Sequence, residues 1–428
     1  MRTLRLLSVA IAMLRKNGFY TCHAGAVGSD SDPHPDVLAS DLLKWLRAND
    51  AYINEKLVVK HLVPNDPSSP RGIFTTGAMD AGEIVCKIPS KLIVKSSEEL
   101  MEGLQAENSH CGAIKAVMKA MSGDDITPYG RYLLAQPKGY TAKFWSQAGR
   151  DLLSNMLKST RTHQLTEYDE LPPHGIYDAA EDLEAECRGD TDDPMFLQAA
   201  MLVDARSDYD KMVPFYDMIN HHNGKYNIRH KYDTYKKSLD GTGYEIATTK
   251  AIQAGGELYN SYNGCTICYD WLDHFGTPEV FIQFGFVEPM PQRWLFDFAR
   301  VKFDLDWKNA DEATGEVMVN FLVPPSKKGM HLLQEELSRL KSFSTMYRNK
   351  SYEDYEGISK YEWETLWQYY DALYDALSNA LQSDATLSDD VWDLDDDWWV
   401  KDGATVAADV DEHYVLPTRS DKTFNDEL

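Results

Sequence analysis

The chain has 428 residues, which is longer than most single domains, and its hydrophobic content of 43% is ample for a core. Its formal net charge of −25 excludes a general attraction to nucleic acids or to anionic lipid surfaces. An acidic surface of this kind either serves solubility alone or favours a basic protein segment as partner.

The six cysteines are too few and too scattered for a disulfide framework. Cys265 and Cys268 form a CxxC pair, but no second cysteine pair follows, so a zinc site is not expected. A disulfide between these two cysteines stays open. His221, His222 and His230 have no carboxylate or cysteine at a ligand spacing, and we therefore expect no metal.

Both ends of the chain carry patterns typical of targeting signals. Residues 1–26 place basic residues before a short apolar run (6–14) and small residues after it, which predicts a signal peptide or leader rather than a membrane span. Arg15 and Lys16 count against cleavage there. A tail at 416–428 ends in Asn-Asp-Glu-Leu, one position away from a retention signal. We expect the endoplasmic reticulum lumen, with cytoplasm or plastid as alternatives.

The first ordered elements follow a Pro- and Asp-rich leader. Residues 36–49 have the apolar spacing of a helix. Short strands are predicted at 73–74, 83–88 and 92–94, with a turn at 78–82. Gly72, just before the first of these strands, would let the main chain approach a ligand closely, although a plain hairpin glycine has the same pattern.

Residues 97–200 are predicted to be mostly helical. The individual helical patterns cover 111–121, 131–134, 142–157 and 179–187, and a further helix is expected at 196–209.

The second half alternates strand and helix patterns. Strands are predicted at 244–248, 257–259 and 281–289, with a helix at 267–275. Residues 305–325 indicate strand and turn, and amphipathic helices are expected at 331–343 and 360–382. Residues 388–403 combine aspartates with tryptophans, which indicates a solvated acidic tail or, alternatively, a cradle for a basic peptide.

The most informative stretch is 212–262. An apolar run ends abruptly at Asn220 and His221, and some forty residues later comes Gly-Glu-Leu-Tyr-Asn-Ser-Tyr, which closes at Tyr262. This pairing resembles the SET-domain methyltransferases, and within them the branch of the Rubisco large-subunit and actin-histidine methyltransferases.

The resemblance implies an α+β fold of several small sheets. A SET domain would cover 36–290 and contain a helical insert at about 97–200. A mostly helical substrate-binding domain would follow at 291–415.

The resemblance also assigns roles to single residues. It implies S-adenosylmethionine as cofactor and Tyr262 as the catalytic tyrosine. The cofactor would be bound by Arg71, Gly72, Ile73, Arg206, Asn220 and His221. The substrate pocket would be formed by Asp208, Tyr216, Tyr259, Phe284 and Phe286.

Methyl transfer needs an uncharged nucleophile and a site that excludes water. A lysine amine has an ordinary pKa near 10.4, and an apolar aromatic pocket lowers it by disfavouring the ammonium. The resemblance favours lysine as the acceptor, and we expect a monomeric lysine methyltransferase that acts on a protein substrate, with a basic segment favoured by the acidic surface. A histidine acceptor is the alternative, because Asp208 could accept from a ring N–H. A SET scaffold that binds a partner without turnover, or a lumenal folding factor, is the non-catalytic alternative.

Overall fold

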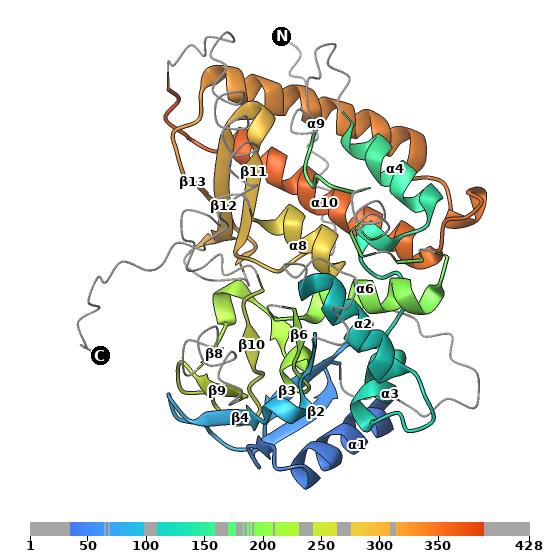
Figure 1. The fold of residues 1–428 in the computed structure, drawn as a ribbon. Coiled ribbons are helices and arrows are strands. Elements are labelled where there is room, and N and C mark those ends of the chain that lie inside the picture. Colours follow the sequence, from blue (N-terminus) through green and yellow to red (C-terminus); the bar gives the residue numbers. More distant parts are fainter. Residues whose placement is uncertain are drawn as a thin grey trace, which may run out of the picture.

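A computed structural model shows two packed bodies with the site of interest between the small strands of the lower one (Figure 1). It describes residues 35–63, 66, 69–97, 109–158, 170–176, 183, 186–187, 189–190, 192–208, 210–230, 243–262, 275–308 and 314–388.

The lower body is built from one four-stranded sheet and three strand pairs. The sheet has the order β1 (Tyr52–Ile53), β4 (Ile84–Ile88), β9 (Tyr244–Thr248) and β8 (Ile228–His230), all antiparallel. The pairs are β2 (Leu57–His61) with β3 (Arg71–Thr75), β5 (Val94–Lys95) with β6 (Lys211–Met212), and β7 (Asn220–His221) with β10 (Tyr259–Asn260). The prediction of several small sheets is confirmed.

Helices cover these sheets and close the first core. They are α1 (Pro35–Ala48), α2 (Ser109–Met121), α3 (Pro128–Leu134) and α6 (Pro194–Arg206). Their apolar faces meet the strands in one cluster that includes Leu42, Ile73, Ile114 and Val203, each fully buried. These four helices thus pack on the same core as the strands.

The upper body contains a second core. An antiparallel sheet of β11 (Gln292–Phe296), β12 (Val301–Trp307) and β13 (Val317–Phe321) packs with α9 (Lys327–Tyr347) and α10 (Lys360–Gln382). Two helices from earlier in the chain, α4 (Gln147–Leu157) and α8 (Thr277–Phe284), join this core rather than the first (Figure 1).

Helix ends follow local capping chemistry. Thr127 caps α3 by accepting from the Gly130 N–H, and Asp193 caps α6 by accepting from the Met195 N–H. A proline opens both helices, where its missing N–H costs nothing. Ser359 and Glu362 form a reciprocal capping box at the start of α10, which begins and ends where the sequence predicts.

The predicted helix 142–157 is interrupted. A short 3-10 turn, η2 (Ala142–Phe144), ends at Trp145, whose backbone is extended. The Ser146 side chain then accepts from the Gly149 N–H and starts α4 as a new helix. A serine at this position competes with the backbone for hydrogen bonds, which favours a cap over a continuous helix.

Three other predicted elements are corrected. Residues 281–289 were expected as a strand, but 281–284 form the end of α8, which stops because Gly285 adopts the left-handed conformation with φ of 77°. At 92–94 only Val94 is in a strand, because 90–92 form a 3-10 turn. The helix expected at 196–209 starts earlier, at Pro194, and ends at Arg206.

One disulfide links α2 to the segment before α6. Cys111 on α2 is bonded to Cys187, just before α6, with a Cα–Cα distance of 5.0 Å and a sequence separation of 76. The cysteine count did not predict this bond, because its two members lie far apart in sequence. Cys86 is a free, buried thiol whose pKa is raised by burial.

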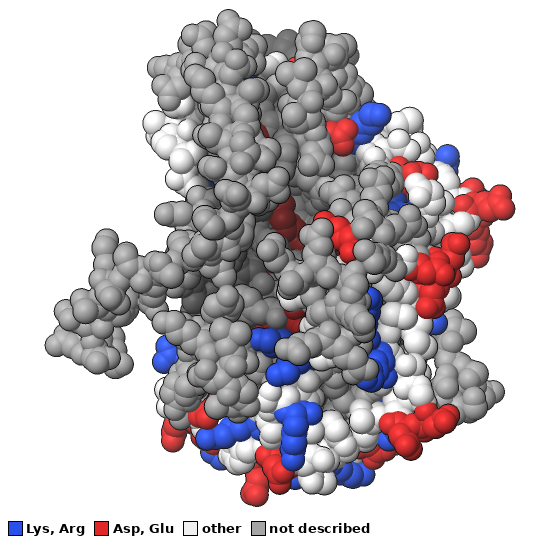
Figure 2. All heavy atoms as spheres, viewed as in Figure 1, with Lys and Arg blue, Asp and Glu red and all other residues white. Residues whose placement is uncertain are grey.

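Several predictions lie outside the described residues: the leader, the helix 267–275, the Cys265–Cys268 pair, the acidic segment 389–403 and the C-terminal tail. Within the described part of the chain, no helix is long and apolar enough to cross a membrane. Nor do the described histidines, cysteines and carboxylates form a group of three that could hold a metal ion. Figure 2 shows Lys and Arg interspersed with Asp and Glu on the visible face of the lower body.

Candidate functional site

Two short parallel strands bring the two sequence motifs together. In the β7–β10 pair Tyr259 lies opposite Asn220 and Asn260 lies opposite His221. The His222 N–H extends the pairing by donating to the Asn260 carbonyl at 2.9 Å. Segments separated by some forty residues therefore present their side chains at one place.

Asn220 connects this strand pair to β3. Its side-chain amide donates to the Arg71 carbonyl at 3.0 Å and to Glu257 Oε1 at 2.8 Å. The Glu257 carboxylate lies so close to Gly72 that a Cβ there would collide with it. A side chain at position 72 would therefore displace the Glu257 carboxylate and disturb its contact with Asn220. Burial raises the pKa of Glu257.

His221 is held in one tautomer by two hydrogen bonds. The Tyr262 N–H donates to Nδ1 at 2.9 Å, so Nδ1 is the acceptor and Nε2 carries the proton. Nε2 then donates to the buried Glu288 carboxylate at 2.7 Å. Glu288 also accepts from Asn223 at 2.8 Å and from the Thr277 hydroxyl at 2.5 Å, which fixes its position in turn.

Tyr262 lies at the centre of an aromatic cluster. Its ring centroid is 4.8 Å from that of Phe284, 5.1 Å from His221 and 6.2 Å from Phe286. Its hydroxyl donates to the Ile219 carbonyl at 2.8 Å. Burial raises the pKa of this phenol above its ordinary value, so the side chain is a neutral hydroxyl at physiological pH.

Half-buried Arg206 and buried Asp217 form a polar pair next to this cluster. Arg206 donates from Nε to the Tyr140 hydroxyl at 3.2 Å and from Nη1 to the Asp217 carbonyl at 3.0 Å. Asp217 Oδ2 accepts from Tyr129 at 3.0 Å, whereas its buried Oδ1 has no hydrogen-bond partner among the described residues. Burial raises the pKa of Asp217 to about 6.

Asp208 and Tyr216 lie on a neighbouring wall with His230. His230 Nε2 is 3.5 Å from Asp208 Oδ2, and its ring centroid is 5.1 Å from that of Tyr216. The Tyr216 hydroxyl accepts from Asn260 on β10 at 2.8 Å, which joins this wall to the strand pair. Burial raises the pKa of Tyr216 well above its ordinary value, with Asp208 adding to the effect.

The remaining predicted residues lie around the same strands. Tyr259 donates its hydroxyl to Glu257 Oε2 at 2.6 Å and packs its ring on His222. The Ile73 side chain is fully buried in the first core, and its carbonyl accepts from the Leu258 N–H at 2.8 Å. The structure thus brings all twelve predicted site residues into one region. Ile73 takes part only through its main chain, because its side chain lies in the first core.

Four residues that hold this site were not singled out from the sequence. They are Tyr140, Asp217, Glu257 and Glu288. Asp217 carried a usable signal, because a carboxylate inside an apolar run needs a buried partner. Glu257 belongs to the Gly-Glu-Leu-Tyr-Asn-Ser-Tyr motif, but no role was predicted for it. Tyr140 and Glu288 gave no local signal, since their partners lie far away in sequence.

Small sheets around an Asn–His strand, with a tyrosine closing the later motif against it, define the architecture of a SET domain. The comparison with family models agrees: residues 70–263 match the SET domain family, and the chain contains a SET domain over this range. The resemblance expected from the sequence is confirmed at this level.

One curated relative is an uncharacterised protein, C16C6.01c, of Schizosaccharomyces pombe, 21% identical over 292 residues. The match covers 61% of this chain and 58% of that protein, so the chain spans little more than half of the relative's length.

Solved structures similar to this chain include Rubisco LSMT bound to AdoMet, at 14% identity and a TM-score of 0.44, covering 80% of this chain and 92% of that one. The SET domain of LSMT bound to lysine and AdoHcy gives 14% identity and a TM-score of 0.43, covering 82% and 93%. Similarity at this level is too low to assign a substrate.

Proposed function

We propose that the protein is an S-adenosylmethionine-dependent protein N-methyltransferase of the Rubisco large-subunit methyltransferase type, acting on a lysine side chain. The observation that carries the proposal is the convergence of Asn220, His221 and Tyr262 on the β7–β10 pair, with the His221 tautomer fixed by Glu288.

The residues present fit the donor. Arg206 offers a half-buried guanidinium to a carboxylate, and the free Oδ1 of Asp217 offers an acceptor to an ammonium, as the two ends of an amino acid require. The Asn220 amide and the main chain at 71–73 would hold the remainder of the molecule. When bound, S-adenosylmethionine supplies an electrophilic methyl group.

The aromatic cluster supports a lysine acceptor. Phe284, Phe286 and the Tyr262 ring present apolar surface, which disfavours an ammonium and lowers the pKa of an entering amine. The neutral Tyr262 hydroxyl, whose proton goes to the Ile219 carbonyl, can accept a hydrogen bond from an amine N–H and so orient the amine with its lone pair free. Phe284 carries no hydroxyl, so an amine in this pocket keeps room and freedom to accept more than one methyl group.

A histidine acceptor is the second candidate, favoured by one observation. Asp208 Oδ2 makes no hydrogen bond within the described part of the chain, although His230 lies at 3.5 Å. This oxygen is available to accept from an imidazole N–H. An imidazole is largely neutral near pH 7 and needs orientation more than deprotonation.

Both candidates are tested by a tritiated-methyl transfer assay on cell lysate, followed by mapping of the labelled residue. We expect label on lysine and a loss of rate of about 100-fold in Tyr262→Phe, because a positioned hydroxyl contributes on this order. Label on histidine that is lost in Asp208→Asn would establish the second candidate. A protein that binds S-adenosylhomocysteine but transfers no label would instead be a binding scaffold.

We also propose residence in the lumen of the endoplasmic reticulum and a basic protein segment as substrate. The buried Cys111–Cys187 disulfide supports the first, since such bonds persist in oxidising compartments. The net charge of −25 supports the second. Cell fractionation with an antibody against the untagged protein tests the location; recovery with cytosolic markers would contradict it.

A further inference from the structure

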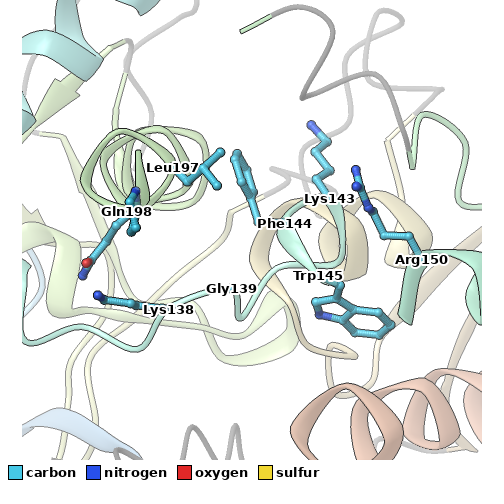
Figure 3. A pocket seen from close by; sticks show the side chains of 9 residues that line it. Lys138, Gly139, Lys143, Phe144, Trp145, Arg150, Leu197 and Gln198 are labelled. Atoms are coloured by element: carbon cyan, nitrogen blue, oxygen red, sulfur yellow. The ribbon is translucent and has the colours of Figure 1, made fainter. Parts of the chain in front are cut away.

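Two features outside the Tyr262 cluster are candidates for a further ligand or modification. One is a cavity of about 460 Å³ between η2, α4 and α6. The cationic side chains of Lys138 and Arg150 and the indole of Trp145 lie at different sides of it and do not converge on one small ligand (Figure 3). The other feature is the exposed turn that connects α9 to α10, and it carries a more specific chemical signal.

The turn after α9 contains the acceptor sequence for asparagine-linked glycosylation. Asn349-Lys350-Ser351 is the one Asn-x-Ser or Asn-x-Thr triplet among the 428 residues, and its middle residue is not proline. One triplet in a chain of this length arises readily by chance. The surroundings of Asn349 therefore decide whether the triplet can be used.

The folded chain presents this triplet to solvent. All three residues are exposed. Helix α9 ends at Tyr347, and the Lys350 N–H donates to the Tyr347 carbonyl at 3.0 Å, so Asn349 lies in a turn beyond the last helical residue. Ser351 then has extended backbone, with φ of −103° and ψ of 158°. The connection lies at the outer edge of the upper body, away from the β7–β10 pair, and a glycan there would leave the methyl-transfer site open (Figure 1).

Neighbouring contacts hold the turn without using the Asn349 side chain. Arg348 donates from both of its terminal nitrogens to the Asp371 carboxylate on α10, at 2.6 and 2.7 Å. The Lys350 ammonium lies over two tyrosine rings, at 5.2 and 5.3 Å from their centroids. Among the described residues, none accepts a hydrogen bond from the Asn349 amide. Replacing one amide hydrogen by a sugar therefore breaks no hydrogen bond within this part of the chain.

From these observations we infer that Asn349 is N-glycosylated when the chain enters the lumen of the endoplasmic reticulum. The donor is a lipid-linked oligosaccharide diphosphate. The Asn349 amide nitrogen forms a bond to C1 of the first sugar and loses one proton. The bond from C1 to the diphosphate oxygen breaks, and the lipid diphosphate leaves with the electron pair. The inference rests on the lumenal residence proposed above, which the Cys111–Cys187 disulfide supports, but it does not depend on methyl transfer.

The test is cell-free synthesis of the full chain in the presence of endoplasmic reticulum microsomes, with protection from added protease as the measure of entry. The chain is made with its own leader and, in parallel, behind the cleavable signal peptide of a secreted protein. We expect the protected chain to carry a mass increase that peptide N-glycosidase F removes. Asn349→Gln and Ser351→Ala should each lose this increase, whereas Ser351→Thr keeps the triplet and should retain it. Asn320→Gln, at an exposed position of β13 outside any such triplet, is the matched control and should be modified like the parent.

The two signal sequences separate failure of the modification from failure of the location. A chain that is protected behind the foreign signal peptide but carries no removable mass overturns the inference, and so does a mass increase that persists in Asn349→Gln. A chain that stays accessible to protease with its own leader contradicts lumenal residence, and with it the modification of the protein in cells. Thermal unfolding of Asn349→Gln should match that of the unmodified parent, which excludes misfolding as the cause of a lost glycan.

Discussion

At the scale of single residues, the site depends on buried carboxylates more than on the motif residues alone. Glu288 fixes the tautomer of His221, and Glu257 fixes Asn220. The main-chain carbonyl of Asp217 accepts a hydrogen bond from Arg206. Glu288 and Glu257 are positioning residues, because each acts through the side chain that it contacts.

Asp217 should give folding stability a specific dependence on pH. Its pKa is about 6 in the folded protein and about 4 in an unfolded chain. The folded state therefore retains a proton that the unfolded state releases, and stability falls as pH rises from 4 to 6. Asp217→Asn should remove this fall, which is on the order of 3 kcal/mol. Denaturant unfolding at several pH values measures it.

Asp210→Asn provides a control of opposite sign. The His110 contact lowers the pKa of Asp210, so its contribution is present at neutral pH and is lost as pH falls through the lowered value. Identical pH profiles for the two variants would contradict the assignment of a raised pKa to Asp217.

Glu288→Gln should weaken donor binding. The buried carboxylate accepts the Nε2–H of His221, and a charge-assisted bond of this kind corresponds to roughly a tenfold or larger rise in Kd when lost. Calorimetry with S-adenosylmethionine measures the affinity, and the ¹⁵N shifts of the His221 ring report the tautomer independently of activity. Glu335→Gln, on the exposed face of α9, is the control. Unchanged affinity and shifts in Glu288→Gln would disprove the positioning role.

At the scale of elements, the turn after α8 places two aromatic residues of the site. Gly285 separates Phe284 from Phe286, has φ of 77°, and lies against the Tyr140 carbonyl, so that a Cβ there would collide with backbone. Gly82 has a similar φ of 80° but open space where a Cβ would be. A comparison of substitutions at the two glycines therefore separates the free-energy cost of the left-handed backbone from the cost of a steric clash.

Gly82→Ala should cost about 1–2 kcal/mol, from the left-handed conformation alone. Gly285→Ala should cost distinctly more and should also reduce methyl transfer, because the Phe284–Tyr262 contact shifts. Differential scanning calorimetry and the transfer assay measure the two effects. Equal destabilisation by both variants would mean that the Tyr140 contact has no consequence.

The sequence predicted elements where periodicity and capping agree, and failed where a single residue redirects the chain. Residues 244–248 and 360–382 were predicted with their observed ends. Ser146 and Gly285 each change the backbone direction within an apolar pattern. The helix predicted at 142–157 is therefore confirmed only over 147–157, and the strand predicted at 281–289 is wrong. The motif residues of the site could be predicted from the sequence. Glu288 and Tyr140 could not, because only tertiary packing brings them into contact with His221 and Arg206.

At the scale of the whole molecule, the disulfide closes a long loop. Cys111 and Cys187 are 76 residues apart, and a cross-link over such a loop stabilises by about 4 kcal/mol through the unfolded chain. The double variant Cys111→Ser/Cys187→Ser should lose stability on this order in chemical unfolding. A reducing agent should lower the stability of the parent and leave the variant unaffected. Equal stability of parent and variant under oxidising conditions would contradict the prediction.

The division of helices between the two cores also limits where the chain can be cut. Helix α4 lies inside residues 70–263, yet it packs on α10, and Arg339 of α9 donates to the Met156 carbonyl at its end at 2.7 Å. A fragment trimmed to the family match would leave Leu153 and Met156 facing water. The stretch that matches the family model and the stretch that completes each core are therefore different here, because α4 lies inside the match but contributes to the second core.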